Sequence, residues 1–285
     1  MSLATSIPLL ISAVGLEYAY SAARKKPFYK RNDALSNLVL GLSYVCVSLF
    51  TGYFIYQIYT WLTQFSVIHL PRTVWTFVLL MVLDDLINYW VHRLSHETRF
   101  FWAVHETHHS SPEYNFTTAA RLSFTTLLTT WPFWLILPLL GFPPEWILIQ
   151  QGISHIYGIF THTQTIRRLG LLEKVFTTPS HHRVHHGSDV KYLDRNYGIM
   201  LIVWDKIFGS FQIEEETPTF GIMHPIGTDN PVKILAHPWI LLTKDVWNAP
   251  TLREKILYLL KPPGWNHYGT GRTARQLQGD LSFSS

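Results

Sequence analysis

One run in the sequence, residues 34–62, contains no Asp, Glu, Lys, Arg or His. A helix of about 20 apolar residues is long enough to cross the roughly 30 Å hydrocarbon layer of a bilayer. An uncharged run of this length is not expected of a core helix in a soluble protein, which keeps polar residues on one side. The run therefore predicts a transmembrane helix, and with it a chain that folds in a membrane.

Other stretches of the chain are also apolar enough to be membrane helices, namely residues 3–23, 73–91, 122–140 and 144–161. Hydrophobic residues make up 47% of the chain and charged residues only 15%, against about 25% charged in a typical soluble domain. We therefore predict an all-α integral membrane bundle of four to five membrane helices.

The distribution of basic residues predicts an orientation for this bundle. Residues 24–31 hold Arg24, Lys25, Lys26, Lys30 and Arg31, and short loops rich in Lys and Arg stay on the cytoplasmic side. The next two helices then bring the chain back to the cytoplasmic face near His92. Hydropathy falls from His162 onward, which indicates a cytoplasmic, histidine-rich cap.

This organisation divides the chain into three parts. Residues 1–72 are predicted to be N-terminal membrane helices, residues 73–265 a histidine-bearing domain, and residues 266–285 a flexible tail rich in Gly, Thr, Ser and Gln. The formal net charge of +4 is too small to imply a nucleic-acid partner.

Histidines are the second constraint. Nine of the 15 fall into three short groups, whereas the chain has one cysteine. The groups are His92-Arg-Leu-Ser-His96, His105-Glu-Thr-His108-His109 and His181-His182-Arg-Val-His185-His186. Side chains three or four residues apart lie on one face of a helix, so each group presents imidazoles together. Eight imidazoles converge in this way, namely those of His92, His96, His105, His108, His109, His182, His185 and His186. Eight exceed the four ligands of one tetrahedral zinc, and they therefore predict two metal ions.

Two other interpretations account for part of this histidine pattern. His105-Glu106-Thr107-His108-His109 satisfies H-E-x-x-H, which in zinc metalloproteases provides two ligands and a glutamate general base. A membrane zinc protease using His105, Glu106 and His109 is the alternative function, although it leaves the other two groups without a role. Bis-histidine haem ligation would use pairs inside the bilayer and not groups at its edge.

An all-nitrogen site for two metals also predicts a chemistry. Imidazole suits iron, zinc and copper, and the positive charge of two ions calls for carboxylates that orient the imidazole N–H groups. Asp85 and Glu97 are the candidates for that role because they lie close to His92 and His96 in the chain. A metal pair facing a bilayer favours dioxygen activation and attack on a lipid C–H bond, since hydrolysis needs only one metal.

The order H-x-x-x-H, H-x-x-H-H, H-x-x-H-H resembles the fatty acid hydroxylase/sterol desaturase superfamily of membrane diiron oxygenases. The resemblance extends over about residues 82–265, and its longer matching runs include Tyr89-Trp90-Val91-His92-Arg93, Thr178-Pro179-Ser180-His181-His182 and Trp204-Asp205-Lys206-Ile207-Phe208-Gly209. Within the superfamily, these motifs are most similar to bacterial sterol-desaturase-like proteins and to alkylglycerol monooxygenases.

The resemblance implies a set of metal ligands, which are His92, His96, His105, His108, His109, His182, His185 and His186. His162 and His181 are expected to be additional ligands or groups that support the ligands. No catalytic side chain is expected beyond these.

The resemblance also implies the cofactors and partners. The expected cofactors are two iron ions, which zinc can replace in isolated protein, together with dioxygen and an external reductant such as tetrahydrobiopterin or a cytochrome- or ferredoxin-type donor. The expected reaction is hydroxylation or desaturation of a sterol, a fatty acyl chain or an ether lipid. Electrons are expected to come from a separate donor. The active site is expected to lie on the cytoplasmic face of a bacterial inner membrane or of the endoplasmic reticulum.

Overall fold

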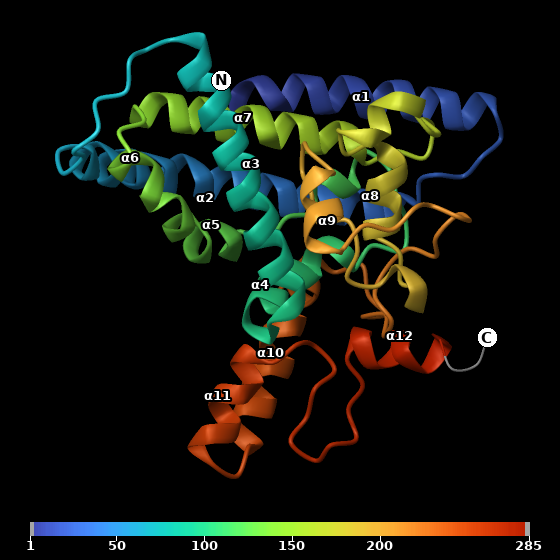
Figure 1. Ribbon diagram of the computed structural model, residues 1–285. Helices are drawn as coiled ribbons and strands as arrows, with labels where there is room; N and C mark the ends of the chain where they lie inside the picture. The colour runs from blue at the N-terminus through green and yellow to red at the C-terminus, as the bar shows by residue number, and fades with distance from the viewer. Residues whose placement is uncertain (1–2, 283–285) are drawn as a thin grey trace.

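The computed structural model describes residues 3–282, and the regular secondary structure of this part is helical, apart from two isolated β-bridges (Figure 1). The α-helices are α1 (Leu3–Ala23), α2 (Arg31–Thr63), α3 (Val74–Glu97), α4 (Arg99–His109), α5 (Thr125–Thr129), α6 (Ile136–Leu139), α7 (Pro144–Thr161), α8 (Pro179–His185), α9 (Val203–Phe208), α10 (Pro231–Asn248), α11 (Leu252–Leu260) and α12 (Ala274–Ser282). Short 3₁₀ helices lie between them at Thr118–Ala120, Trp131–Leu135, Gly170–Lys174 and Val190–Tyr192. The predicted all-α class is therefore confirmed.

Two helices, α2 and α3, are long and apolar enough to cross a membrane. The 33 residues of α2 give it a length of about 50 Å at 1.5 Å per residue, well above the roughly 30 Å that a bilayer requires. Many of its large apolar side chains are exposed, among them Leu42, Leu49 and Phe50. An outward apolar surface of this kind matches lipid and not water.

The expected membrane helix over residues 122–140 is not formed, and this prediction was wrong. The segment is divided into α5, a 3₁₀ helix and α6, none longer than five residues. Pro132 and Pro138 each remove a backbone N–H donor, which interrupts a helix. The hydroxyls of Thr129 and Thr130 bond the carbonyls four residues back, an arrangement that bends helices.

The other expected segments are helical at the predicted places. α1 spans residues 3–23 and α7 residues 144–161. α7 packs against α2, and α1 packs against α7 (Figure 1). Apolar side chains of α2, α3, α6 and α7 form one core that includes Tyr59, Leu80, Leu137 and Ile147. This core runs along α3 as far as Val91. His92 and His96 follow Val91 and lie next to α4 and α8.

The C-terminal region packs against the histidine-bearing helices. α10 lies against α4 and forms a hairpin with α11, which extends away from the rest of the molecule in Figure 1. Within the tail that we expected to be flexible, residues 274–282 form α12, and Gln278 donates hydrogen bonds to the carbonyls of Val190 and Leu193. Residues 283–285 lie outside the described part.

The close approach of α2 to the 3₁₀ helix Thr118–Ala120 depends on Gly41. A Cβ atom at this position would lie 2.9 Å from both the Cβ and the carbonyl oxygen of Ala120, so α2 and this segment must separate to accept it. We expect Gly41→Ala to destabilise the protein by about 1–3 kcal/mol, seen as a lower midpoint of thermal unfolding. Gly52→Ala is the matched control on the same helix, because a Cβ there meets no atom within 4 Å. Equal midpoints for the two variants would contradict this packing.

Candidate metal centre

Four elements bring the histidine side chains together at one end of the bundle. α3 provides His92 and His96 one turn apart, and α4 provides His105, His108 and His109. The other histidines come from the end of α8, which carries His182 and His185 with His186 directly after it, and from His162 directly after α7. The helical spacing that the sequence predicted within each group is therefore present.

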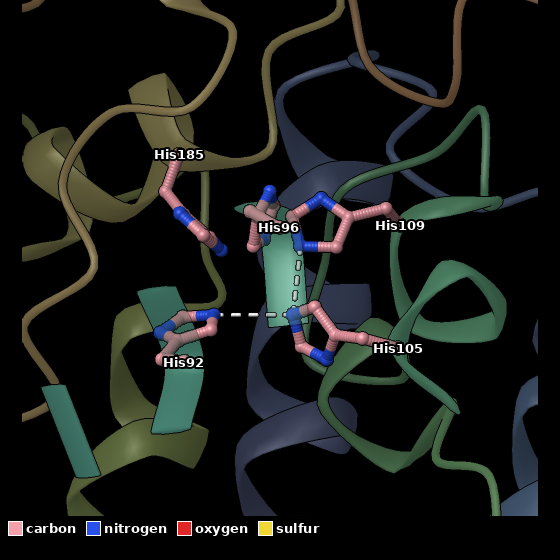
Figure 2. Close-up of side chains that lie close together, drawn as sticks. All are labelled: His92, His96, His105, His109 and His185. Carbon is pink, nitrogen blue, oxygen red and sulfur yellow. Dashed lines mark hydrogen bonds between the residues drawn. The ribbon is translucent and has the colours of Figure 1, made fainter. Parts of the chain in front are cut away.

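The nine side chains form two separate groups. Figure 2 shows the first group, whose ring nitrogens converge from three helices. The members of the first group are His92, His96, His105, His109 and His185, and those of the second are His108, His162, His182 and His186. One nitrogen from each member of a group lies within 4.8 Å of the others. The structure thus brings together all eight predicted ligands and His162. α3 contributes only to the first group and α7 only to the second, whereas α4 and α8 contribute to both.

The nitrogen spacing within each group suits ligands of one metal ion. In the first group, Nε2 of His105 lies 3.1 Å from Nε2 of both His92 and His109. In the second group, Nε2 of His162 lies 3.1 Å from that of His182 and 3.2 Å from that of His108. Two nitrogens bound to one metal at about 2.1 Å lie roughly 3.0–3.4 Å apart, depending on coordination geometry.

Backbone carbonyls orient the rings so that Nε2 faces inward. The Nδ1 atoms of four histidines each face a carbonyl oxygen: His92 that of Tyr197 at 2.7 Å, His108 that of Arg121 at 3.3 Å, His162 that of Gly158 at 2.7 Å, and His185 that of Arg195 at 2.9 Å. A carbonyl oxygen only accepts hydrogen bonds, so Nδ1 must carry the proton in each of these rings. In a neutral ring, Nε2 then carries the lone pair that binds metal.

The protons on Nδ1 determine whether a cation fits between the rings of the second group. His108 and His162 both carry their proton on Nδ1, so the two Nε2 atoms that face each other at 3.2 Å are both acceptors. Two lone pairs at this distance repel unless a cation lies between them. In addition, the buried Nε2 atoms of His96, His185 and His186 have no hydrogen-bond partner, and such atoms require an explanation such as a bound ion. The donor set therefore fits a metal in each group.

The electrostatic environment keeps these imidazoles ready to bind. Burial, reinforced by the neighbouring histidines, holds the pKa of six of them well below the usual value of 6.5, namely His105, His108, His109, His182, His185 and His186. Their neutral form therefore persists across the physiological pH range. Neutral imidazole is the form that binds metal, so no proton has to be displaced from these nitrogens.

Three of the predicted site residues take other partners. His181 accepts a hydrogen bond from the backbone N–H of Thr178 and caps α8, so it shapes the helix that carries His182. Asp85 accepts hydrogen bonds from the backbone N–H groups of Met200 and Leu201 and from the indole of Trp204.

Glu97 forms ion pairs with Arg93 and Arg275. Asp85 and Glu97 therefore hold a loop and a helix surface, whereas we expected both carboxylates to orient imidazoles.

A carboxylate does contact the first group, but it is Asp194. Its Oδ1 lies 3.4 Å from Nδ1 of His96, and Asp194 adopts a left-handed backbone conformation with φ of 54°. Asp194 follows His186 by eight residues. This spacing placed Asp194 near the third histidine group in the chain but did not predict its contact with His96. The carbonyl partners of the rings carry no sequence signal, because every residue has a carbonyl.

Comparisons with known proteins agree with this site. Residues 77–210 match the model of the fatty acid hydroxylase family, and this segment contains all nine converging histidines. This segment is therefore similar to the fatty acid hydroxylase family. It is 38% identical to alkylglycerol monooxygenase of Homo sapiens over 266 residues, which cover 90% of this chain and 58% of the human protein.

More distant relatives are lipid enzymes as well. The chain is 37% identical to alkylglycerol monooxygenase of Xenopus tropicalis, over 88% of this chain and 56% of that protein. It is 33% identical to ornithine lipid hydroxylase OlsE of Rhizobium tropici, over 47% of this chain and 41% of the relative. The chain spans about half the length of the curated relatives it matches. No solved structure matches it.

The neighbours His181 and His182 provide a matched test of the second group. We expect His182→Ala to lower the metal content of anaerobically iron-loaded protein from about two ions per chain to about one, because it removes one of four ligands. His181→Ala should keep both ions, because His181 caps α8 and is not a member of either group. Metal analysis of the purified proteins measures both, and equal losses in the two variants would contradict the assignment.

Proposed function

We propose that this protein is a membrane-bound diiron oxygenase that uses dioxygen and external electrons to hydroxylate a lipid. The observation that carries the proposal is the pair of buried, all-histidine groups, which share the helices α4 and α8. A single hydrolytic zinc needs one set of three or four ligands, and a second set has no role in that reaction. Two adjacent metals account for both sets.

The chain's own residues favour iron over zinc in the working enzyme. Five histidines converge in the first group, more than the four ligands of tetrahedral zinc, and imidazole suits iron as well as zinc. When bound, an iron pair would take up electrons from the external reductant and pass them to dioxygen at its open positions. The protein supplies neutral ligands, fixes them through carbonyl contacts, and excludes bulk water by burying eight of the nine rings.

A lipid is the substrate class that this architecture supports. Candidate membrane helices α2 and α3 present apolar side chains outward, so a lipid can approach the site laterally without leaving the bilayer. The relatives' names also refer to lipids, an alkylglycerol and an ornithine lipid among them. Ether lipids are the first substrates to test, because the longest matches are to alkylglycerol monooxygenases.

The proposed orientation places the metal centre on the cytoplasmic side. The basic loop between α1 and α2, residues 24–30, is the motive, because such loops stay in the cytoplasm. Electrons would then come from a cytoplasmic reductant, with tetrahydrobiopterin and a cytochrome- or ferredoxin-type donor as the two classes to supply.

Labelled dioxygen tests the reaction directly. Membranes that contain the protein are given ether lipids, sterols or fatty acyl lipids, each reductant in turn, and ¹⁸O₂, and the lipids are analysed by mass spectrometry. We expect one labelled oxygen atom in a hydroxylated lipid or in an aldehyde formed from it. Loss of two hydrogens without label would indicate desaturation, and products that form without dioxygen would contradict the proposal.

A substitution of Glu106 distinguishes the proposed oxygenase from a zinc protease. A protease of the H-E-x-x-H type needs Glu106 as general base beside the metal, but its carboxylate accepts a hydrogen bond from Nδ1 of His237 on α10 at 2.9 Å. We expect Glu106→Gln to keep lipid oxidation within a few-fold of wild type, because Gln still accepts from His237. Loss of a general base would lower activity about 10²–10⁴-fold, and a loss of that size with cleavage of a peptide substrate would favour the protease.

A further inference from the structure

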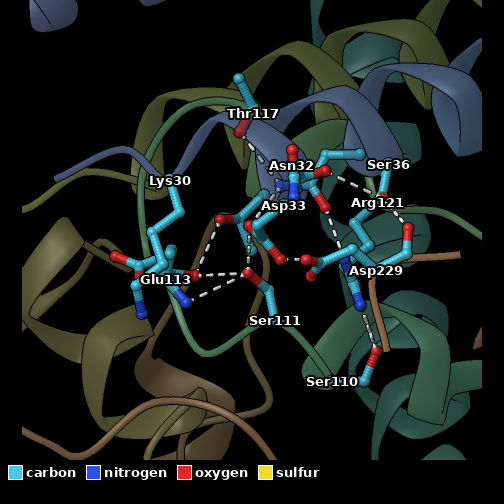
Figure 3. Close-up of polar contacts among 12 residues, drawn as sticks. Lys30, Asn32, Asp33, Ser36, Ser110, Ser111, Glu113, Thr117, Arg121 and Asp229 are labelled. Atoms are coloured by element: carbon cyan, nitrogen blue, oxygen red, sulfur yellow. Dashed lines mark hydrogen bonds and ion pairs between the residues drawn. The ribbon is translucent and has the colours of Figure 1, made fainter. Parts of the chain in front are cut away.

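The side chain of Arg121 is buried between the start of α2 and the end of α4, in a cluster of polar groups apart from the histidines (Figure 3). Its guanidinium is 2% exposed and forms an ion pair with Asp33, which is 3% exposed, at 3.1 Å. Burying such a pair costs more in lost hydration than burying an apolar pair, and often brings no net stability. Stability alone therefore does not account for a buried ion pair between α2 and α4.

On one side, Arg121 binds the last turn of α4, which carries His108 and His109. Its Nε donates to the carbonyl of Thr107 at 2.9 Å and to the hydroxyl of Ser110 at 3.0 Å. These groups lie at the C-terminal end of α4, where carbonyls lack helical partners and a cation is favourable. The carbonyl of Arg121 itself faces Nδ1 of His108 at 3.3 Å. One residue thus contacts both the helix end and a ring of the second histidine group.

On the other side, Arg121 is anchored to the first turns of α2. Its Nη1 donates to Oδ1 of Asp33 and, at 2.8 Å, to Oδ1 of Asn37. The second carboxylate oxygen of Asp33 accepts from Ser111 at 2.8 Å and from Asn37 at 3.1 Å. The planar, multiply donating guanidinium is what allows one side chain to reach α2 and α4 together, and a lysine cannot reproduce this.

We infer that Arg121, held by Asp33, is a positioning residue for the second metal ion. It fixes the end of α4 and the ring of His108 relative to α2, so that a candidate membrane helix sets the geometry of that histidine group. The inference rests on the proposed function, because it requires that each histidine group binds a metal. It assigns to the buried pair a role in metal affinity that is distinct from a contribution to folding.

The test measures binding of Co²⁺ to metal-free, full-length protein in lipid nanodiscs by visible absorption. Wild type should bind two equivalents. Arg121→Lys keeps the positive charge beside Asp33 but loses the contacts to Thr107 and Ser110, and Asp33→Asn weakens the anchor on α2. In both variants we expect the second equivalent to bind about 10- to 100-fold more weakly, the usual effect of losing a group that orients a metal ligand, and the first to bind as in wild type.

Two reference variants identify the affected group. His162→Ala should also weaken the second equivalent, and adding Arg121→Lys to it should then cause little further loss, because both changes act on one group. Arg99→Gln is the matched control. Arg99 begins α4 and forms a 2.7 Å ion pair with Asp245, away from the histidines, so both equivalents should bind with wild-type affinity.

The inference would be overturned if Arg121→Lys bound both equivalents with wild-type affinity. It would also be overturned if Arg121→Lys and Asp33→Asn both failed to fold, as judged by gel filtration and circular dichroism, since the cluster would then act in folding. Failure of the proposed function looks different, because wild-type protein itself would then bind fewer than two equivalents.

Discussion

The structure is organised around one electrostatic constraint: the lone pairs of two buried imidazole nitrogens, Nε2 of His108 and Nε2 of His162, face each other at 3.2 Å. Without a cation, neutral acceptors at this spacing repel, and protonation is opposed by burial. The arrangement is therefore stable only when other contacts hold the rings or when metal is bound. Much of the polar structure near the site is explained by this need, including the carbonyls at Nδ1 and the buried pair of Arg121 and Asp33.

The loop of residues 194–201 shows how these contacts are linked. Its Tyr197 carbonyl orients His92 of α3, while the carboxylate of Asp205 binds the backbone N–H groups of Tyr197 and Gly198 at 2.7 and 2.8 Å. The other end of the loop is held by Asp85, seven residues before His92 on the same helix. α3 thus carries the candidate ligand His92 together with Asp85, which fixes the loop whose carbonyl orients His92. A carboxylate in this position acts on the metal site through the backbone, without touching an imidazole.

The sequence predicted the helices and the convergence of the histidines better than it predicted how the histidines divide between the two groups. Residue spacing within one helix follows from 3.6 residues per turn, so the groupings on α3, α4 and α8 were accessible. Distances between helices were not, and therefore neither was the separation of His108 from His109 or the place of His162 in the second group. The broken segment at residues 122–140 was missed because its hydropathy suits a membrane helix, whereas Pro132, Pro138 and the threonine hydroxyls decide its backbone.

Adjacent residues of α4 belong to different histidine groups, with His108 in one and His109 in the other. Successive side chains on an α-helix project about 100° apart. The peptide unit that joins His108 to His109 therefore helps to set the spacing between the two candidate metal positions. Ordering α4 around either ion also orders ligands of the other, which lowers the conformational entropy that remains to be lost. Filling one position would then lower the entropic cost of filling the other, while each position keeps ligands of its own and can be filled alone.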